Sequence, residues 1–301
     1  MKKKYLFVGD PNSINLELIF KSHKFLMNKV KYIILGNFND LEKYKKIIKS
    51  KISMNEIYDP INFEKVEKKS LNIFNIENVS KIKYENLLNQ IEISNYLSNK
   101  NKIDLVTMPI NKSVFKKKIE FNGMTEHLSK LNNKSTLMLM HGERFSIIPL
   151  TTHINLKDVS KHVKKNILIQ KLKNILFQIN RKNYNLNFKE IRFLCYNPHC
   201  SEDNTLGFED KIIYETISKF RKIKGMFAAD SAFKDRNIKD ILFISMYHDQ
   251  ALIPFKILNK KGINLTLGLN YKRMSPAHGT AKNIKYKNTA DNSSFIACMG
   301  H

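Results

Sequence analysis

The chain has 301 residues, 42% of them hydrophobic, and a formal net charge of +25. This length and composition exclude wholesale disorder and suit one large α/β unit or two domains. No apolar run approaches the ~20 residues of a membrane-spanning helix, so we expect no membrane partner. The charge by itself would indicate a nucleic-acid partner. Lys, Asn and Ile are abundant in every segment, however, and the lysines form no single stripe, so biased composition explains the charge better.

The N-terminus and the cysteines both predict a cytoplasmic protein. A basic tetrapeptide leads into a short apolar stretch that residues 9–11 interrupt, which favours a buried strand over a secretory leader. Cys195, Cys200 and Cys298 are an odd number without a Cys-x-x-Cys pair. We therefore expect neither a disulfide framework nor a thiolate zinc site, as suits a reducing compartment.

Short apolar strands alternate with amphipathic helices along the chain. Strands are expected, in chain order, at residues 5–9, 30–36, 103–108, 136–140, 145–150, 191–196, 241–246 and 263–267. Helices are expected near residues 14–28, 85–99, 156–180 and 208–223. This alternation predicts an α/β fold with a mostly parallel sheet and helices on both faces.

Residues able to bind ligands or to catalyse follow five of these strands. They form the segments 9–11, 109–112, 151–153, 197–199 and 247–250. Because ligands of parallel sheets bind beyond the carboxyl ends of the strands, these segments predict one site at that edge.

Three of the nine histidines, His153, His199 and His248, occupy equivalent places after strands. Neutral imidazole is a common ligand of divalent metals, and three ligands leave a coordination position for substrate. Such a metal would lower the pKa of a substrate hydroxyl and stabilise the oxygen of the ketone that forms. Each histidine alone would more often be a capping or core residue, but three in matching places favour the metal site.

The region from Lys256 through Asn264 to Arg273 is a candidate anion site. Arg offers a bidentate fork and Lys a compact charge for phosphate or carboxylate. In so basic a chain any single Lys is more often a solvated surface charge. Lys256 differs because it follows the apolar residues 251–255, where a surface lysine is not expected.

The segment Ala277-His278-Gly279-Thr280-Ala281 places a glycine at the expected start of a helix. Backbone amides there can receive the phosphates of a cofactor, although an ordinary turn before a helix is an equal alternative. Neither G-x-G-x-x-G nor G-x-x-x-x-G-K-[ST] occurs, so a Rossmann or P-loop site has no support.

Together these motifs resemble those of the 4-hydroxythreonine-4-phosphate dehydrogenase family of vitamin B6 synthesis. Asn-Pro-His at 197–199 and Tyr-His-Asp-Gln at 247–250 are specific as a pair, and the matches run in order from residue 8 to about residue 294. The other matching segments are residues 9–11, 109–112, 123–126, 151–153, 264–269 and 278–281.

The resemblance implies two α/β/α domains with mostly parallel sheets, related in fold to the isocitrate and isopropylmalate dehydrogenases. The active site would lie in the interdomain cleft of a homodimer. Residues 1–117 with 282–301 would form the first domain. Residues 118–281 would form the second and carry the metal, substrate and dimer contacts.

The resemblance also implies roles for individual residues. One divalent ion (zinc, magnesium or cobalt) would bind His153, His199 and His248, with ligands from both subunits. The candidate catalytic groups are Asp230, Asp249 and Lys256. The substrate-binding positions are Met124, Thr125, Lys256, Asn264 and Arg273. The segment expected to hold the adenosine part of NAD or NADP is His278, Gly279, Thr280 and Ala281.

The implied reaction is the NAD-dependent oxidation of 4-phosphooxy-L-threonine to 2-amino-3-oxo-4-phosphooxybutanoate, in pyridoxine 5′-phosphate biosynthesis. This product loses CO2 to give 3-amino-2-oxopropyl phosphate, the ketone acting as electron sink.

The sequence departs from the family pattern at several positions. Met124 replaces a His of the family, Ala277 replaces an Asp, residues 13–15 replace Gly-Ile-Gly, and Cys200-Ser201 replaces Ala-Gly. These changes keep open a related dehydrogenase acting on threonate or erythronate phosphate, and a catalytically silent homologue. A basic nucleic-acid-binding α/β protein is disfavoured because no recognised RNA or DNA module is present.

Overall fold

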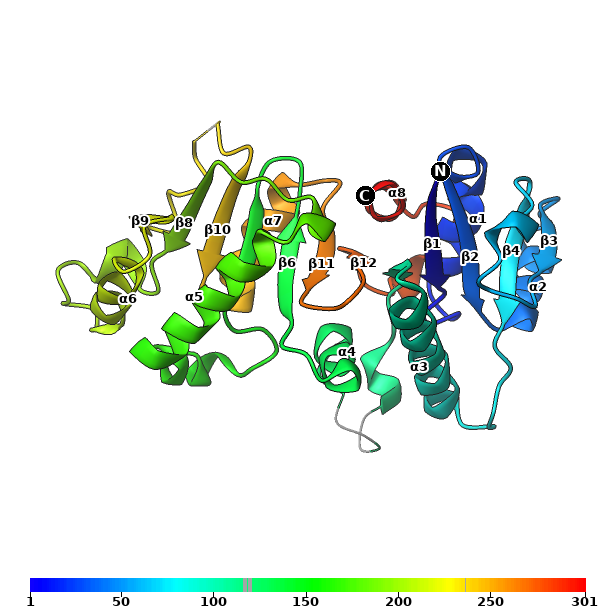
Figure 1. Ribbon diagram of the computed structural model, residues 1–301, viewed down its shortest axis with the longest axis horizontal. Coiled ribbons are helices and arrows are strands. Elements are labelled where there is room, and N and C mark those ends of the chain that lie inside the picture. The colour runs from blue at the N-terminus through cyan, green and yellow to red at the C-terminus, as the bar shows by residue number, and fades with distance from the viewer. Residues whose placement is uncertain (116–117, 119–120, 236) are drawn as a thin grey trace. The chain divides into compact units, whose positions relative to one another are not determined.

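The computed structural model describes residues 1–115, 118, 121–235 and 237–301, in two compact units (Figure 1). Unit 1 comprises Met1–Lys134 and Leu269–His301, and unit 2 comprises Ser135–Gly268. The boundaries expected from the sequence follow residues 117 and 281, and residue 117 lies outside the described residues. Described residues between the two sets of boundaries pack on unit 1, because Leu128, Leu269 and Tyr271 belong to the same apolar cluster as Tyr5.

Unit 1 contains, among its described residues, a six-stranded sheet in the order β3-β4-β2-β1-β5-β12. All of its neighbouring strands are parallel. The strands are β1 (Lys2–Phe7), β2 (Val30–Gly36), β3 (Ser53–Glu56), β4 (Ser70–Asn75), β5 (Asp104–Thr107) and β12 (Arg273–Pro276). Consecutive residues of β1 are buried, as is typical of a strand covered on both faces.

The helices of unit 1 are α1 (Asn15–Leu26), α2 (Phe38–Ile47), α3 (Lys83–Asn101), α4 (Met124–Asn132) and α8 (Ser293–Gly300). Helix α3 packs against β1, β2 and β5, and α8 packs against β12 and α1. Helix α2 begins after Asn37, whose side chain accepts a hydrogen bond from Asp40 N and so caps the helix.

Unit 2 has the strand order β11-β6-β7-β10-β8-β9 over its described residues. Its strands are β6 (Leu137–His141), β7 (Ser146–Pro149), β8 (Glu190–Leu194), β9 (Ile223–Phe227), β10 (Ile241–Ser245) and β11 (Ile263–Leu267). Strands β7, β10, β8 and β9 are parallel, whereas β6 is antiparallel to both β7 and β11. The helices are α5 (Lys165–Ile179), α6 (Glu209–Ile217) and α7 (His248–Leu258).

The α/β class and the mostly parallel pairing are therefore confirmed. The single long helix expected over residues 156–180 is wrong. Leu156–Asp158 and Ser160–His162 are short 3-10 helices, and α5 begins only at Lys165. Lys164 is extended, with φ −127° and ψ 135°, and this conformation interrupts the helix. No helix of the described ranges is long and apolar enough to cross a membrane.

Lys4 on β1 gives a test of how burial affects stability. Its side chain is 0% exposed, and Nζ donates to Cys298 O at 3.2 Å and lies 3.9 Å from Asp104 Oδ2. Burial lowers the pKa of Lys4 from 10.5 to about 8, although Asp104 opposes the shift. The folded state therefore loses this proton at lower pH than the unfolded state, and the free energy of unfolding rises as pH rises from about 8 towards 10.5.

We expect the Lys4→Met variant to lack this rise. The difference in free energy of unfolding, wild type minus variant, should increase by about 3 kcal/mol between neutral pH and the upper end of that range. Urea denaturation at a series of pH values measures the difference. Parallel pH profiles for the two proteins would contradict the prediction.

Candidate functional site

Hydrogen bonds join the turns that follow β7, β10 and β8. These three strands are neighbours and parallel, so their carboxyl ends lie at one edge of the sheet. Thr151 donates from both N (3.0 Å) and Oγ1 (2.6 Å) to Met246 O. Gln250 Oε1 accepts from Met246 N at 3.1 Å, and its Nε2 donates to Cys195 O at 2.7 Å. The start of α7 is thereby tied to the ends of both neighbouring strands.

The three predicted ligand histidines lie in these turns. His153 follows β7, His248 is the first residue of α7, and His199 lies in the 3-10 helix Pro198–Ser201 after β8. The rings of His153 and His248 are side by side, with centroids 5.7 Å apart. His248 Nδ1 lies 2.7 Å from Asp249 Oδ1, the kind of carboxylate contact that orients a metal-binding imidazole and leaves its Nε2 for the metal.

The described residues of a single chain do not form a complete metal site. Among the described residues, no group of three or more His, Cys, Asp or Glu side chains is arranged to hold a metal ion. His199 has φ 49°, in the left-handed region, and it is exposed. Among the described residues, one chain thus brings together two imidazoles and one carboxylate.

A disulfide bond closes the turn that carries His199, so the expectation of no disulfide is wrong. Cys195 and Cys200 are bonded, with Cα atoms 5.0 Å apart, within the usual range for a disulfide. Cys298 is a buried free thiol. An odd number of cysteines does not exclude one disulfide. Cys195 and Cys200 lie in one turn after a strand and are bonded, and Cys298 lies in the other unit.

The disulfide predicts the number of thiols that react with Ellman's reagent. We expect a single reactive thiol per chain after denaturation without reductant, and all three after reduction. Removing Cys298 by Cys298→Ser should leave none without reductant. Full reactivity of the unreduced, denatured wild type would contradict the bond.

A cavity of about 660 Å³ lies beyond the carboxyl ends of β7, β9 and β10 in unit 2. Asp230 follows β9, and His248 and Asp249 follow β10; all three line this cavity. The structure therefore brings both predicted acidic residues together with one predicted ligand histidine. The rest of the lining includes Thr151, Thr152, Tyr247 and Gln250 and an apolar wall of Ile154, Leu156, Ile253 and Ile257.

Asp210 orders the turn of His199 and was missed from the sequence. Its side chain is 3% exposed. Its carboxylate accepts hydrogen bonds from Tyr196 N (2.6 Å), Asn197 N (2.9 Å) and Ser201 Oγ (2.7 Å). An acidic residue in the first turn of the helix after a candidate ligand turn was the signal that could have indicated this role.

Two predicted substrate residues lie in unit 2 outside the lining of the cavity. Lys256 is exposed in the last turn of α7, so the expectation that its apolar neighbours would exclude it from the surface is wrong. Phe255 is the residue of that turn that is buried. Asn264 on β11 is half-buried, and its Oδ1 accepts no hydrogen bond from the described part of the chain.

Unit 1 brings Arg273 and Thr125 together. The Arg273 guanidinium donates to Thr107 Oγ1 from Nε (2.9 Å) and Nη2 (2.6 Å), and to Thr125 Oγ1 from Nη1 (3.4 Å). Burial lowers the pKa of Arg273 to about 10, which still leaves it charged at neutral pH. Met124 begins α4 and packs against the apolar cluster of unit 1.

The candidate cofactor segment lies in unit 1 after β12. His278 Nδ1 is 2.9 Å from Gly279 O, and Thr280 O accepts from Ile14 N at 3.2 Å. The helix expected to start at Gly279 is wrong, because the next helical element is the short 3-10 helix Lys282–Ile284. Ala281 has φ 41°, which prevents a continuous α-helix.

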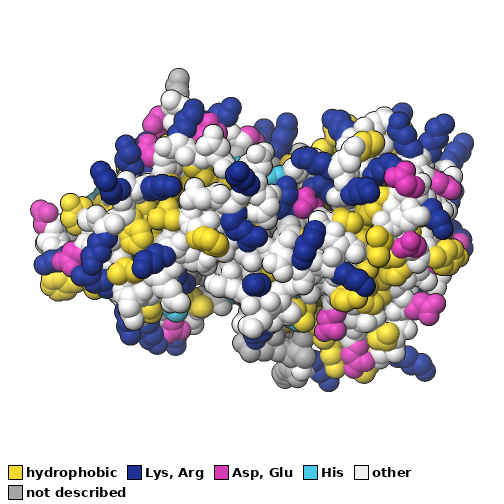
Figure 2. Space-filling model, in the orientation of Figure 1, with side chains coloured by type: hydrophobic (Ala, Val, Ile, Leu, Met, Phe, Trp, Pro, Cys, Tyr) yellow, Lys and Arg dark blue, Asp and Glu magenta, His cyan; other side chains and the backbone are white. Residues whose placement is uncertain are grey.

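The basic side chains do not form one binding surface on the visible face. Figure 2 shows Lys and Arg spread over this face, interleaved with acidic and apolar side chains. This distribution supports biased composition as the source of the net charge.

Comparison with known proteins gives the family. The family model for "Pyridoxal phosphate biosynthetic protein PdxA" matches residues 17–301. The chain belongs to this family. It is 36% identical to the 4-hydroxythreonine-4-phosphate dehydrogenase of Aquifex aeolicus, over 99% of this chain and 96% of that protein. It is 33% identical to the enzyme of the same name from Hydrogenobaculum sp., over 96% of this chain and 94% of that one.

Solved structures agree at the level of the fold. The 4-hydroxythreonine-4-phosphate dehydrogenase of Klebsiella pneumoniae superposes with a TM-score of 0.80 at 22% identity, covering 100% of this chain and 97% of that chain. A terephthalate 1,2-cis-dihydrodiol dehydrogenase from Burkholderia xenovorans gives a TM-score of 0.59 at 15% identity, covering 99% and 98%. The resemblance predicted from the motifs is confirmed.

Proposed function

We propose that this chain is an oxidoreductase that uses NAD or NADP to oxidise 4-phosphooxy-L-threonine to 2-amino-3-oxo-4-phosphooxybutanoate. The product then loses CO2 to give 3-amino-2-oxopropyl phosphate, a step in pyridoxine 5′-phosphate synthesis. One observation carries the proposal. In a chain 36% identical to a 4-hydroxythreonine-4-phosphate dehydrogenase, Asp230, His248 and Asp249 line one cavity at the carboxyl edge of a parallel sheet.

Residues of this chain can accept the proton that the reaction releases and can bind the anionic groups of the substrate. As hydride leaves C3 for the nicotinamide, the C3 hydroxyl loses its proton, and we assign its acceptance to Asp230 or Asp249, because both line the cavity. Arg273, with Thr125, Asn264 and Lys256, binds the anionic ends of the substrate. The segment 278–281 binds the adenosine part of the cofactor.

We assign one divalent metal ion (zinc, magnesium or cobalt) to His153, His199 and His248, with ligands drawn from two subunits of a homodimer. The incomplete set within one chain supports a shared site. The apolar wall of the cavity supports a dimer, because Leu156 is 65% exposed and Ile257 73% exposed in the single chain. We also propose a cytoplasmic location.

A steady-state assay tests the proposal. Purified protein with 4-phosphooxy-L-threonine, divalent metal and NAD or NADP should reduce the cofactor, and threonate or erythronate 4-phosphate should be poorer substrates. A higher kcat/KM for one of the latter would establish the related dehydrogenase instead. Turnover of none of them, by protein that is folded and metal-loaded, would favour a silent homologue.

Met124 tests whether the substrate contact of the family has been lost. If the family His donates a hydrogen bond to the substrate, Met124→His should raise kcat/KM for 4-phosphooxy-L-threonine by about 10-fold, mainly through KM. Met54→His, at a half-buried position on β3, is the control and should leave kcat/KM unchanged. Flat or lower activity of Met124→His would show that the packing of Met124 on the apolar cluster is its role.

A further inference from the structure

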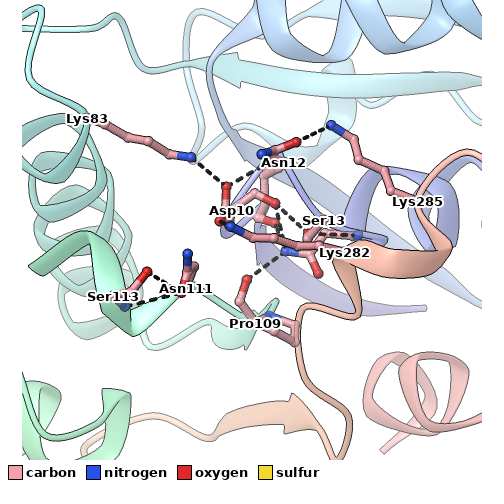
Figure 3. Close-up of polar contacts among 11 residues, drawn as sticks. Asp10, Asn12, Ser13, Lys83, Pro109, Asn111, Ser113, Lys282 and Lys285 are labelled. Atoms are coloured by element: carbon pink, nitrogen blue, oxygen red, sulfur yellow. Dashed lines mark hydrogen bonds and ion pairs between the residues drawn. The ribbon is translucent and has the colours of Figure 1, made fainter.

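The loop after β1 gathers polar side chains that the proposed reaction does not use (Figure 3). Asp10 in this loop is 0% exposed. Lys83 Nζ, from the first residue of α3, lies 3.0 Å from Asp10 Oδ1, and Lys282 Nζ lies 3.8 Å from Oδ2. Asp10 Oδ2 accepts no hydrogen bond from any described residue. A buried carboxylate is thus held by two lysines that remain 47% and 40% exposed.

The same loop is bonded directly to the candidate cofactor segment. Ile14 N donates to Thr280 O at 3.2 Å, and Lys285 Nζ donates to Asn12 Oδ1 at 2.7 Å. Asp10 sets the position of Asn12, because Asp10 Oδ1 accepts from Asn12 N at 3.0 Å. Asp10 therefore contacts the residues that follow this segment by two routes, directly at Lys282 and through Asn12 at Lys285, as Figure 3 shows.

The loop is itself fixed to the end of β5. Asp10 N and Asn15 Nδ2 both donate to Pro109 O, at 3.1 Å and 2.7 Å. Gly9 has φ 73°, and a Cβ there would lie 2.5 Å from Pro109 O, so only glycine allows this approach. These contacts hold the backbone of Asp10 in a fixed position.

The charge balance favours a positioning role over a free anion site. Asp40 shares the environment of Asp10: burial raises the pKa of Asp40, Lys43 and Lys83 oppose the rise, and Asp10 adds to it. Lys83 and Lys282 already pair with Asp10, and Lys43, Lys83 and Lys285 act on Asp40, so these lysines are partly neutralised before any anion binds.

The cofactor segment needs an external anchor. Ala281 and Tyr286 have φ 41° and 65°, conformations that are unfavourable for residues other than glycine. Only the three-residue 3-10 helix Lys282–Ile284 lies between them. Contacts from outside the segment must therefore maintain it.

We propose that Asp10 is a positioning residue for the cofactor, holding residues 278–285 in the conformation that receives the dinucleotide. This inference rests on the proposed function, which assigns residues 278–281 to the cofactor. Loss of the Asp10 charge removes the ion pair with Lys282. Cofactor binding must then also order the segment, which lowers the affinity.

The test compares Asp10→Asn, Lys282→Gln and the double variant with a control. Glu42→Gln is the control, because it breaks an exposed ion pair with Lys46 (3.2 Å) in the same unit. NADH and NADPH dissociation constants are measured by fluorescence titration without substrate, and hydrogen exchange of residues 278–286 is measured without cofactor. Each single variant should weaken binding of the preferred cofactor by about 10-fold and speed exchange in the segment. The double variant should also bind the cofactor about 10-fold more weakly than wild type, and not about 100-fold, because both changes break the same ion pair between Asp10 and Lys282.

Activity separates positioning from general damage. At saturating cofactor, kcat and the KM for 4-phosphooxy-L-threonine should match wild type in both single variants, whereas the KM for cofactor rises. If Asp10→Asn does not fold, Lys282→Gln, at a half-exposed site, carries the test alone. If wild type and the folded variants bind the cofactor equally well and hydrogen exchange of the segment is unchanged, only this inference is overturned. Wild type without affinity for either dinucleotide overturns the proposed function and this inference with it.

Discussion

Replacing Arg273 by Lys should lower kcat/KM for the phosphorylated substrate by about 100-fold, although the charge is kept. Arg273 is 4% exposed and uses its fork on two threonines: Nε and Nη2 bond Thr107 Oγ1, and Nη1 bonds Thr125 Oγ1. A lysine ammonium cannot span both hydroxyls and also present a planar face to a carboxylate or phosphate. Each lost bond to a charged group costs ~1.5–3 kcal/mol, or about 10- to 150-fold.

Two controls separate recognition from stability. Arg221→Lys, at an exposed position in unit 2, should leave kcat/KM and the midpoint of thermal unfolding unchanged. Thr107→Val should reproduce part of the Arg273→Lys defect, because it removes the hydroxyl that accepts from Nε and Nη2 of Arg273. An Arg273→Lys enzyme that is folded and has unchanged kcat/KM would exclude Arg273 from substrate binding.

The sequence predicts the parts of this fold in which local pattern and burial agree. The strand expected at 241–246 is β10 (Ile241–Ser245), and its five residues are all buried. The polar turn after it was predicted to form a site, and its His248 and Asp249 do line the cavity. A continuous apolar run that ends in polar residues is sufficient to predict both the strand and its binding end. The run determines the strand, and the parallel sheet determines which end of the strand binds ligands.

Other features left no recognisable signal in the sequence, and two of them, β12 and the ion pair of Asp10 with Lys282, depend on contacts between residues distant in the chain. β12 is four residues long, and its Arg273 and Met274 pair with Leu105 and Val106 of β5. The disulfide depends on the tight turn that brings Cys200 back towards Cys195. The ion pair of Asp10 with Lys282 joins residues near opposite ends of the chain. In a chain with 52 basic residues, no pattern distinguishes Lys282 from the lysines that face solvent.

The antiparallel strand β6 of unit 2, by contrast, has a local explanation. Both β6 and β7 were expected as strands, but only four residues separate Leu137–His141 from Ser146–Pro149. A connection this short forces an antiparallel hairpin, since a parallel pair requires a crossover of a dozen or more residues. The length of this loop therefore predicts that β6 is antiparallel to β7 in an otherwise mostly parallel sheet.

Replacing a predicted metal ligand should greatly weaken metal binding. His248→Gln and His199→Gln should each weaken binding of the divalent ion by more than about 100-fold, because each removes one of three imidazoles. Equilibrium dialysis with Zn²⁺ followed by metal analysis measures this, and His162→Gln, a histidine of a 3-10 helix in the same unit, is the control. Asp249→Asn, which removes the carboxylate 2.7 Å from His248 Nδ1, should cost about 10- to 100-fold.

Mixed dimers decide whether two subunits share the site. In a single chain His153 and His248 lie side by side, but the described residues hold no cluster of three ligands. If His199 and His248 of one site come from different subunits, a dimer of one His199→Gln chain and one His248→Gln chain contains one intact site and one doubly damaged site. Dimers isolated through two different affinity tags should therefore bind about half as much metal as wild type, although neither variant alone binds it. If all three ligands come from one chain, every site in the mixed dimer lacks a histidine, and metal binding stays at the level of the single variants.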